Sequence, residues 1–202
     1  MTPFYPVSLN LIGRPCVVIG AIDDREAIEK AAALREAGAA LVWLTDPEHV
    51  READVADAFF VISTPQDEAL SARLRSYADR NRFLLCCIDQ PKHGFIAMAA
   101  IAKAGPVRIA ISTTGLAPRV GKVLKERLQT AMDATFARFI DCLASQRGRV
   151  RREFPHADES SKRRNAMIRS ATGFEAEIHF SYPQWFHDEL RESLLPRVID
   201  DA

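Results

Sequence analysis

Residues 109–129, IAISTTGLAPRVGKVLKERLQ, decide the fold expected for this chain. An apolar strand runs into an STTG turn, and Pro118 then opens a long helix, because proline suits the first helical position. Apolar residues share one side of that helix: Val120, Leu124, Leu128, Met132, Phe136 and Ile140. The pattern predicts an apolar face that needs a partner, either a second copy of the chain or the chain's own tail.

Before this helix, short apolar runs alternate with amphipathic segments. They predict strands at 16–19, 41–44, 58–63, 83–88 and 107–111, and helices at 24–37 and 68–81. This alternation is typical of an α/β fold, a Rossmann-like parallel sheet with helices on both faces. We expect this domain over residues 1–112 and a helical region over residues 113–202, with a polar loop at 157–165 and a helix at 166–173. The stretch 175–202 is assigned no function.

Composition indicates a globular protein of 202 residues, 48% of them hydrophobic, with no apolar run long enough to cross a bilayer. The start, MTPFYPVSLN, lacks the basic-then-apolar order of a signal peptide. We therefore expect a cytoplasmic protein without membrane contact. The four cysteines lack a CxxC spacing and are interpreted as small core residues.

Charge is unevenly spread along the chain, although the formal net charge is zero. Residues 1–105 hold 11 Lys/Arg and 14 Asp/Glu, or −3, whereas residues 106–202 hold 16 and 13, or +3. The second half is therefore the better place for an anion. Its basic clusters are Arg147, Arg149, Arg151 and Arg152, then Lys162, Arg163 and Arg164. They are interpreted as anion contacts or solvated surfaces, and without interleaved aromatic residues they do not indicate nucleic-acid binding.

Five segments, in this order, resemble one enzyme family: LIGRPCVVIG, EAGA, FFVIST, CIDQP, and AISTTG followed by AP. The family is the precorrin-2 dehydrogenase/sirohydrochlorin ferrochelatase group, which forms the amino-terminal module of siroheme synthase. The resemblance covers roughly residues 4–175. It implies NAD-dependent oxidation of precorrin-2 to sirohydrochlorin, with ferrochelatase activity in the same family. It also implies a tetrapyrrole substrate, a dinucleotide-binding first domain, and a homodimer that forms through the helical region.

The cofactor is expected at the carboxyl ends of the strands, where parallel sheets bind ligands. The residues that fall there are Gly20, Ile22, Asp23, Asp24, Arg25, Thr45, Asp46, Ser63 and Thr64. The family carries a glycine triplet after the first strand, whereas here one glycine remains and Asp23 and Asp24 bring carboxylates to the place of the pyrophosphate. Either aspartate can cap the following helix. Arg25 offsets the negative charge of the two aspartates only if its side chain turns toward the ligand.

The connection between the second and third strands is also short. Family members place another strand and a helical connection there, whereas residues 47–57 barely admit a parallel crossover. These departures leave two functions open. The chain is an NAD-dependent precorrin-2 dehydrogenase, or it is a relative without dehydrogenase activity that binds a tetrapyrrole, inserts metal or regulates.

Asp89 is the predicted catalytic residue. In the family an aspartate after the matching strand is required for precorrin-2 oxidation and for metal insertion, so the resemblance implies that Asp89 takes a ring proton. The alternative is a turn cap before Pro91. His93 follows four residues later, but a lone His–Asp pair separated by a proline does not indicate a metal ligand, and no metal site is predicted.

The STTG turn and the start of the long helix are expected to bind substrate carboxylates. Hydroxyl groups, backbone donors and cations suit such acid groups. The candidates are Ser112, Thr113, Thr114, Gly115, Arg119 and Lys122. The alternatives are a turn that caps the helix and charges that face solvent.

Overall fold

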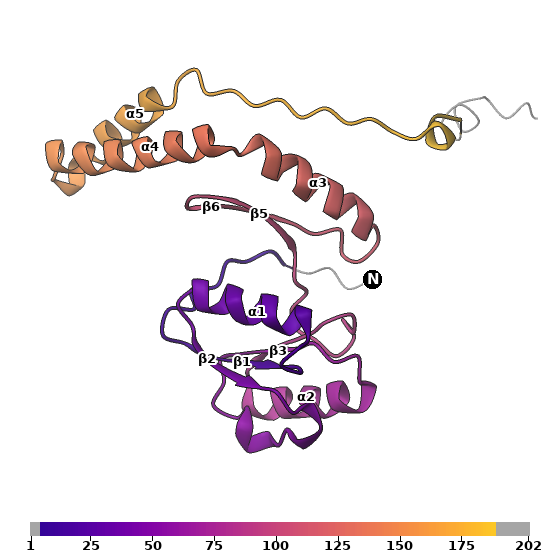
Figure 1. The fold of residues 1–202 in the computed structure, drawn as a ribbon. Helices are drawn as coiled ribbons and strands as arrows, with labels where there is room; N and C mark the ends of the chain where they lie inside the picture. Colours follow the sequence, from indigo (N-terminus) through magenta and orange to yellow (C-terminus); the bar gives the residue numbers. More distant parts are fainter. Residues whose placement is uncertain (1–4, 189–202) are drawn as a thin grey trace, which may run out of the picture. The chain divides into compact units, whose positions relative to one another are not determined.

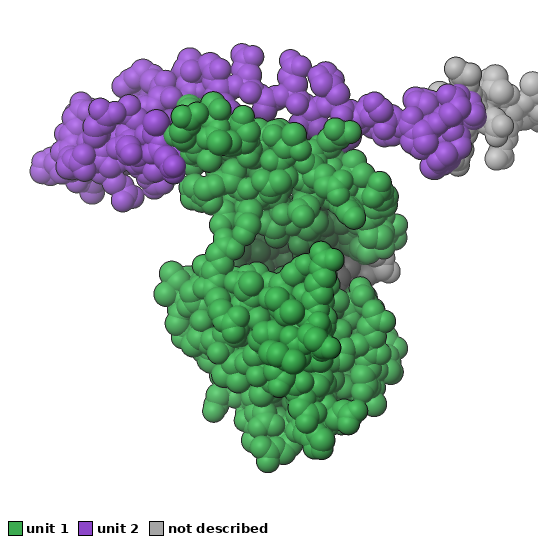
Figure 2. All heavy atoms as spheres, viewed as in Figure 1, with its two compact units in different colours: residues 1–140 green, residues 141–202 purple. Residues whose placement is uncertain are grey.

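The computed structural model of the chain describes residues 5–188 (Figure 1). The chain forms two compact units, divided between Ile140 and Asp141 (Figure 2). Unit 1 covers residues 1–140 and unit 2 covers residues 141–202. Every strand of the described chain lies in unit 1, whereas the regular elements of unit 2 are helical.

A parallel sheet forms the first part of unit 1. Its four strands have the order β2-β1-β3-β4, with β1 paired to both β2 and β3. The strands are β1 Pro15–Ile19, β2 Ala40–Leu44, β3 Phe60–Ser63 and β4 Leu84–Cys87. The apolar runs predict all four, because strands covered on both faces by helices are apolar nearly throughout.

Two helices cover opposite faces of this sheet (Figure 1). α1 spans Arg25–Glu36 and α2 spans Glu68–Asn81, and each begins after an N-cap aspartate, Asp24 and Asp67 respectively. The helices bury small and branched side chains against the strands: Ala27, Ala31, Leu34, Leu70, Leu74 and Ala78. Full burial of one such leucine contributes about 1.5–3 kcal/mol, so these contacts hold the domain together.

The link from β2 to β3 makes a parallel crossover without an α-helix. It contains two 3-10 turns, η1 at Pro47–His49 and η2 at Glu52–Asp54. Val50 and Val55 are buried in the same apolar cluster as the α2 side chains. The shortened segment is therefore a packed connection rather than an open loop.

The prediction that residues 107–111 add a fifth strand to this sheet is wrong. β6, Val107–Ile111, pairs antiparallel with β5, Ala100–Ala104, in a separate two-stranded sheet. Gly105 and Pro106 join the two strands, and Gly105 adopts a φ of 51°, as tight hairpin turns require. The hairpin gives β6 the backbone hydrogen bonds that a parallel neighbour would otherwise supply.

The single long helix expected from Pro118 is in fact two helices. α3 spans Pro118–Ala131 and α4 spans Ala134–Glu153. The Asp133 carboxylate accepts the Phe136 N–H at 2.8 Å and so starts the second helix. α3 packs on the β5–β6 hairpin around a small buried cluster of Ala102, Ala104 and Met132. Unit 1 therefore continues beyond residue 112, and the chain itself covers part of the predicted apolar face.

Unit 2 contains residues 141–153 of α4, the 3-10 turn η3 at Ala157–Glu159 and α5 at Ser160–Ser170. The prediction of a loop at 157–165 is wrong, because the Glu159 carboxylate accepts the His156 N–H at 3.3 Å and α5 follows directly. Residues 189–202, part of the stretch without an assigned function, lie outside the described residues.

Candidate functional site

The turn after β1 is closed around Gly20. A Cβ at this position would lie 2.3 Å from Thr64 Oγ1 and 2.8 Å from Ala27 Cβ, so only glycine fits. The Trp43 indole N–H donates to the Gly20 carbonyl at 2.9 Å and fixes the turn from the side of β2. Gly20 therefore allows β1, α1 and the end of β3 to approach closely.

Asp24 occupies the N-terminus of α1 beside this glycine. Its Oδ1 accepts the Glu26 N–H at 2.9 Å, and its Oδ2 accepts the hydroxyl of the buried Thr64. These two donors hold the pKa of the Asp24 carboxyl below its usual range, with Thr64 the larger cause. A negative charge therefore sits at neutral pH on the positive end of the helix dipole.

The side chains of the other predicted cofactor residues are exposed, buried or paired elsewhere. Arg25 pairs with Glu29 at 3.0 Å along α1, and Asp46 pairs with His49 at 2.8 Å. Ser63 is completely buried, which makes its hydroxyl inaccessible to a ligand in this arrangement. Three more are exposed at the ends of β1 and β2: Ile22, Asp23 and Thr45.

This geometry tests whether the crevice fits a dinucleotide. A pyrophosphate binds to open N–H groups at a helix N-terminus, with glycines that allow close approach. Here Asp24 takes the Glu26 N–H, and Thr64 fills the space beside Gly20. In this arrangement the crevice therefore lacks the open Glu26 N–H and the space beside Gly20 that a pyrophosphate would use.

Asp89 follows β4 in a different environment. It adopts a left-handed φ of 59°, a conformation in which aspartate is enriched among non-glycine residues. The Gln66 amide donates to Asp89 Oδ2 at 3.1 Å, and Oδ1 has no hydrogen-bond partner among residues 5–188. The exposed carboxylate therefore keeps one oxygen available to accept a proton.

Asp89 lines a cavity of about 770 Å³ in unit 1. Figure 2 shows the hollow in this unit, between the part that carries α1 and the part that carries α3. Its lining includes Asp89 and further predicted substrate residues: Ser112, Thr113, Thr114, Gly115 and Lys122. Arg119 is not among the lining residues. Lys30 and Lys125 also line the cavity but were not predicted. The position of Lys125, nearly one helical turn after Lys122, was the available signal for one of them.

The charges in the cavity are only partly paired. Lys30 pairs with Glu26 at 2.7 Å. Glu29 also lines the cavity, but it pairs with Arg25, which lies outside the lining. Lys122 and Lys125 have no ion-pair partner in the described part of the chain. The cavity therefore offers two unpaired ammonium groups and the Asp89 carboxylate. Its size lies within the range of small-molecule sites, and its charges suit a ligand that carries acid groups.

Two thiols in the lining are unsuited to metal binding or nucleophilic chemistry. Burial raises the pKa of Cys86 to about 12 and also raises the pKa of Cys87, so both stay protonated at neutral pH. Nearby, His93 contacts Glu68 at 2.7 Å. Within residues 5–188, no group of three His, Cys, Asp or Glu side chains could hold a metal ion.

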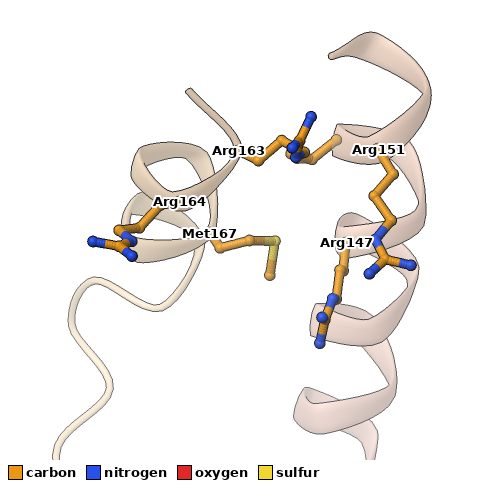
Figure 3. Close-up of a pocket in the computed structure, with 6 residues that line it drawn as sticks. Arg147, Arg151, Arg163, Arg164 and Met167 are labelled. Carbon is orange, nitrogen blue, oxygen red and sulfur yellow. The ribbon is translucent and has the colours of Figure 1, made fainter. Parts of the chain in front are cut away.

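A second hollow, of about 380 Å³, lies in unit 2 between α4 and α5 (Figure 3). Its lining combines two apolar side chains with four cations: Val150, Met167, Arg147, Arg151, Arg163 and Arg164. Arg163 donates to the carbonyl oxygens of Phe154 and His156, at 2.7 and 2.5 Å, and so holds the turn before α5. This arginine of the predicted basic clusters has a structural role.

Comparisons with known proteins point in one direction. Residues 7–100 match the family model described as "Putative NAD(P)-binding". A siroheme synthase of Hahella chejuensis is 28% identical over 176 residues, which cover 77% of this chain and 37% of that relative. A siroheme synthase of Methylococcus capsulatus is 28% identical over 193 residues, 87% of this chain and 40% of that relative. The chain spans about two fifths of the length of these relatives. The matches confirm the predicted resemblance.

The fold has a counterpart among solved structures. "SirC, precorrin-2 dehydrogenase" is similar with a TM-score of 0.67 and 20% identity, over 94% of this chain and 100% of that chain. This likeness confirms the predicted fold, a Rossmann-like sheet followed by a helical region. Among residues 5–188, no helix has the length and apolar character needed to span a membrane.

Proposed function

We propose that this relative of the siroheme synthases acts in siroheme biosynthesis and oxidises precorrin-2 to sirohydrochlorin, with NAD as its cofactor. The observation that carries the proposal is the Asp89 cavity. Among residues 5–188, the Asp89 carboxylate at the carboxyl end of β4 keeps one oxygen free, and Lys122 and Lys125 on α3 have no ion-pair partner. The two lysines can bind the carboxylates of a tetrapyrrole that has several acid side chains.

In the proposed reaction each group has a distinct task. Lys122 and Lys125 bind substrate carboxylates, and the hydroxyl groups of the STTG turn orient them. Gln66 holds Asp89 Oδ2 in place, and Oδ1 accepts the ring proton that the substrate loses during oxidation. NAD supplies the acceptor for the hydride. Gly20, Thr45 and Asp46, at the ends of β1 and β2, would hold the cofactor.

An anaerobic assay of precorrin-2 oxidation tests this proposal. Asp89→Asn keeps the shape of the side chain and removes the base, so the rate should fall at least about 100-fold. Asp57 is an exposed residue of the β2–β3 link, so Asp57→Asn is the matched control and should retain the rate of the unaltered protein. An Asp89→Asn variant that oxidises precorrin-2 at the full rate would exclude Asp89 as the base.

A second candidate function is favoured by Asp24. A chain whose helix N-terminus is already capped by a carboxylate can bind a tetrapyrrole, or insert iron into sirohydrochlorin, without a dinucleotide. This candidate predicts porphyrinoid binding that depends on Lys122 and Lys125, together with no oxidation of precorrin-2 at any NAD concentration. Titration with sirohydrochlorin and the oxidation assay, performed on one preparation, separate the two functions.

A homodimer in the cytoplasm completes the proposal. Leu116 precedes α3 and is 69% exposed, and Val120 on the first turn of α3 is 52% exposed. Such exposed apolar side chains favour contact with a second copy of the chain. Sedimentation should give a dimer that Val120→Asp weakens. The cytoplasmic location is supported by the cysteines, because all four are free thiols, as is usual in a reducing compartment.

A further inference from the structure

We infer that Asp24 is an internal substitute for the cofactor's phosphate, and that it holds the dinucleotide affinity of this chain low until it leaves the α1 cap. The inference rests on the proposed dinucleotide site. It goes further because it names the side chain that controls access to that site, which neither the resemblance nor the comparisons assign.

The position of Asp24 in the topology supports this inference. From β1 the chain first goes to β2 on one side, and β3 then pairs with β1 on the other side. Ligands of such sheets bind in the crevice that opens where the strand order reverses. Asp24 follows β1, Thr64 follows β3, and their hydrogen bond joins the two sides of this crevice.

The hydrogen bonds lead to the same conclusion. The first N–H groups of a helix have no partner within the helix, and a bound phosphate satisfies them from outside. Asp24 Oδ1 already accepts one of these groups, from Glu26. Its Oδ2 also lies 3.2 Å from the place of a Cβ on Gly20, next to the closer Thr64 hydroxyl and Ala27 methyl group. Ligand and side chain therefore compete for one position.

Charge adds to this competition. A pyrophosphate that approached α1 would meet the ionised Asp24 carboxylate at short range, and the two negative charges would repel each other. Arg25 does not neutralise this charge, because its guanidinium pairs with Glu29 on the next turn of the helix. Removal of the charge alone should therefore strengthen dinucleotide binding.

Calorimetric titration of the full chain with NAD tests the inference. Asp24→Asn is the decisive variant, because asparagine caps helices as well as aspartate does but carries no charge. We expect its NAD dissociation constant to fall about tenfold or more, which corresponds to about 1.4 kcal/mol. Asp24→Gly also removes the side chain and should bind at least as tightly. Thermal melts of both variants verify that they are folded.

Asp67→Asn is the matched control. Asp67 caps α2 through the Ala69 and Leu70 N–H groups, at 2.8 and 3.0 Å, at the same edge of the sheet but without contact to Gly20. Its NAD affinity should remain within twofold of the unaltered chain. The inference is overturned if folded Asp24→Asn binds NAD no more tightly than the unaltered chain, or if Asp67→Asn gives an equal gain.

The outcome is separable from that of the proposed function. Tighter NAD binding by Asp24→Asn without oxidation of precorrin-2 supports the inference and refutes the dehydrogenase. Oxidation of precorrin-2 by the unaltered chain, with no affinity gain in Asp24→Asn, supports the dehydrogenase and refutes the inference. No NAD binding by any folded variant up to millimolar concentration refutes both and leaves the second candidate function.

Discussion

Asp24 and Asp89 follow strands of one sheet at the same edge, yet their surroundings are opposite. Asp24 has donors on both carboxylate oxygens, one from α1 and one from Thr64. Asp89 is exposed, and in the described part of the chain only one of its oxygens has a donor, Gln66. A carboxylate whose acceptors are satisfied within the chain stabilises structure, whereas one with a free acceptor can bind a ligand or a proton. Position at a strand end does not by itself distinguish these roles.

The largest effect on stability should come from a substitution in the tightly packed turn around Asp24. Gly20→Ala places a methyl group against Thr64 and Ala27, so the free energy of unfolding should fall by about 3 kcal/mol. Urea denaturation measures this loss. Gly148→Ala, on α4, is the control, because its Cβ would meet only Arg152 Nη1, at 3.7 Å. If Gly20→Ala were as stable as the unaltered chain, the turn around Gly20 would be loosely packed.

On the open side, Lys122→Gln and Lys125→Gln should each weaken sirohydrochlorin binding by about tenfold, because a charge-assisted hydrogen bond is lost. Fluorescence titration measures the affinity. Arg127→Gln is a matched control on the same helix, exposed and outside the cavity lining, and should bind normally. An equal loss in Arg127→Gln would indicate a general effect of net charge rather than a site.

A smaller effect should follow from removal of the donor that fixes Asp24. Thr64→Val keeps the shape of the buried side chain but removes its hydroxyl, so stability should fall by about 1 kcal/mol. The pKa of Asp24 should rise in this variant, because Thr64 is the main cause of its lowered value. Carbon-detected NMR titration of the Asp24 carboxyl measures this shift. An unchanged pKa would show that the Thr64 contact is not formed in solution.

The smallest expected effect is on the stability of the protein at acidic pH. A carboxyl with a lowered folded pKa contributes stability above its unfolded pKa, near 3.8, and loses it as the pH falls through the folded value. Between pH 5 and pH 2.5 the unaltered chain should therefore lose slightly more stability than Asp24→Asn. Urea denaturation at several pH values measures the difference. Parallel curves would mean that Asp24 has similar pKa values in the folded and unfolded chain.

Local patterns predict much of the fold, whereas Asp89 was singled out through the family resemblance. The four parallel strands and their two helices follow from apolar runs and capping residues, and the N-cap proves to be Asp24, one of the two aspartates that the sequence offered. These patterns do not predict the hairpin, because β5 is rich in alanine, a poor strand former. The Gly105-Pro106 turn was the available signal for it. The break at Asp133 escapes because the apolar period continues through Met132 and Phe136.

The contacts that define the closed turn could not be predicted. Asp24 and Thr64 are 40 residues apart in the sequence, and their hydrogen bond depends on the register between β1 and β3. The same holds for Lys30, which reaches the cavity only because α1 packs on the side of the sheet that faces it. Sequence periodicity describes one element at a time, whereas these contacts join elements that are distant in the sequence.

Trp43 offers a direct optical view of the β1–α1 turn. Its indole N–H donates to the Gly20 carbonyl at 2.9 Å, and the chain has two tryptophans in all, of which Trp185 is 64% exposed. A Trp185→Phe variant would therefore emit from Trp43 alone. Any rearrangement of the turn that frees the Gly20 carbonyl changes the hydrogen bond of the fluorophore itself, so such a rearrangement would shift the Trp43 emission wavelength during rapid mixing with NAD.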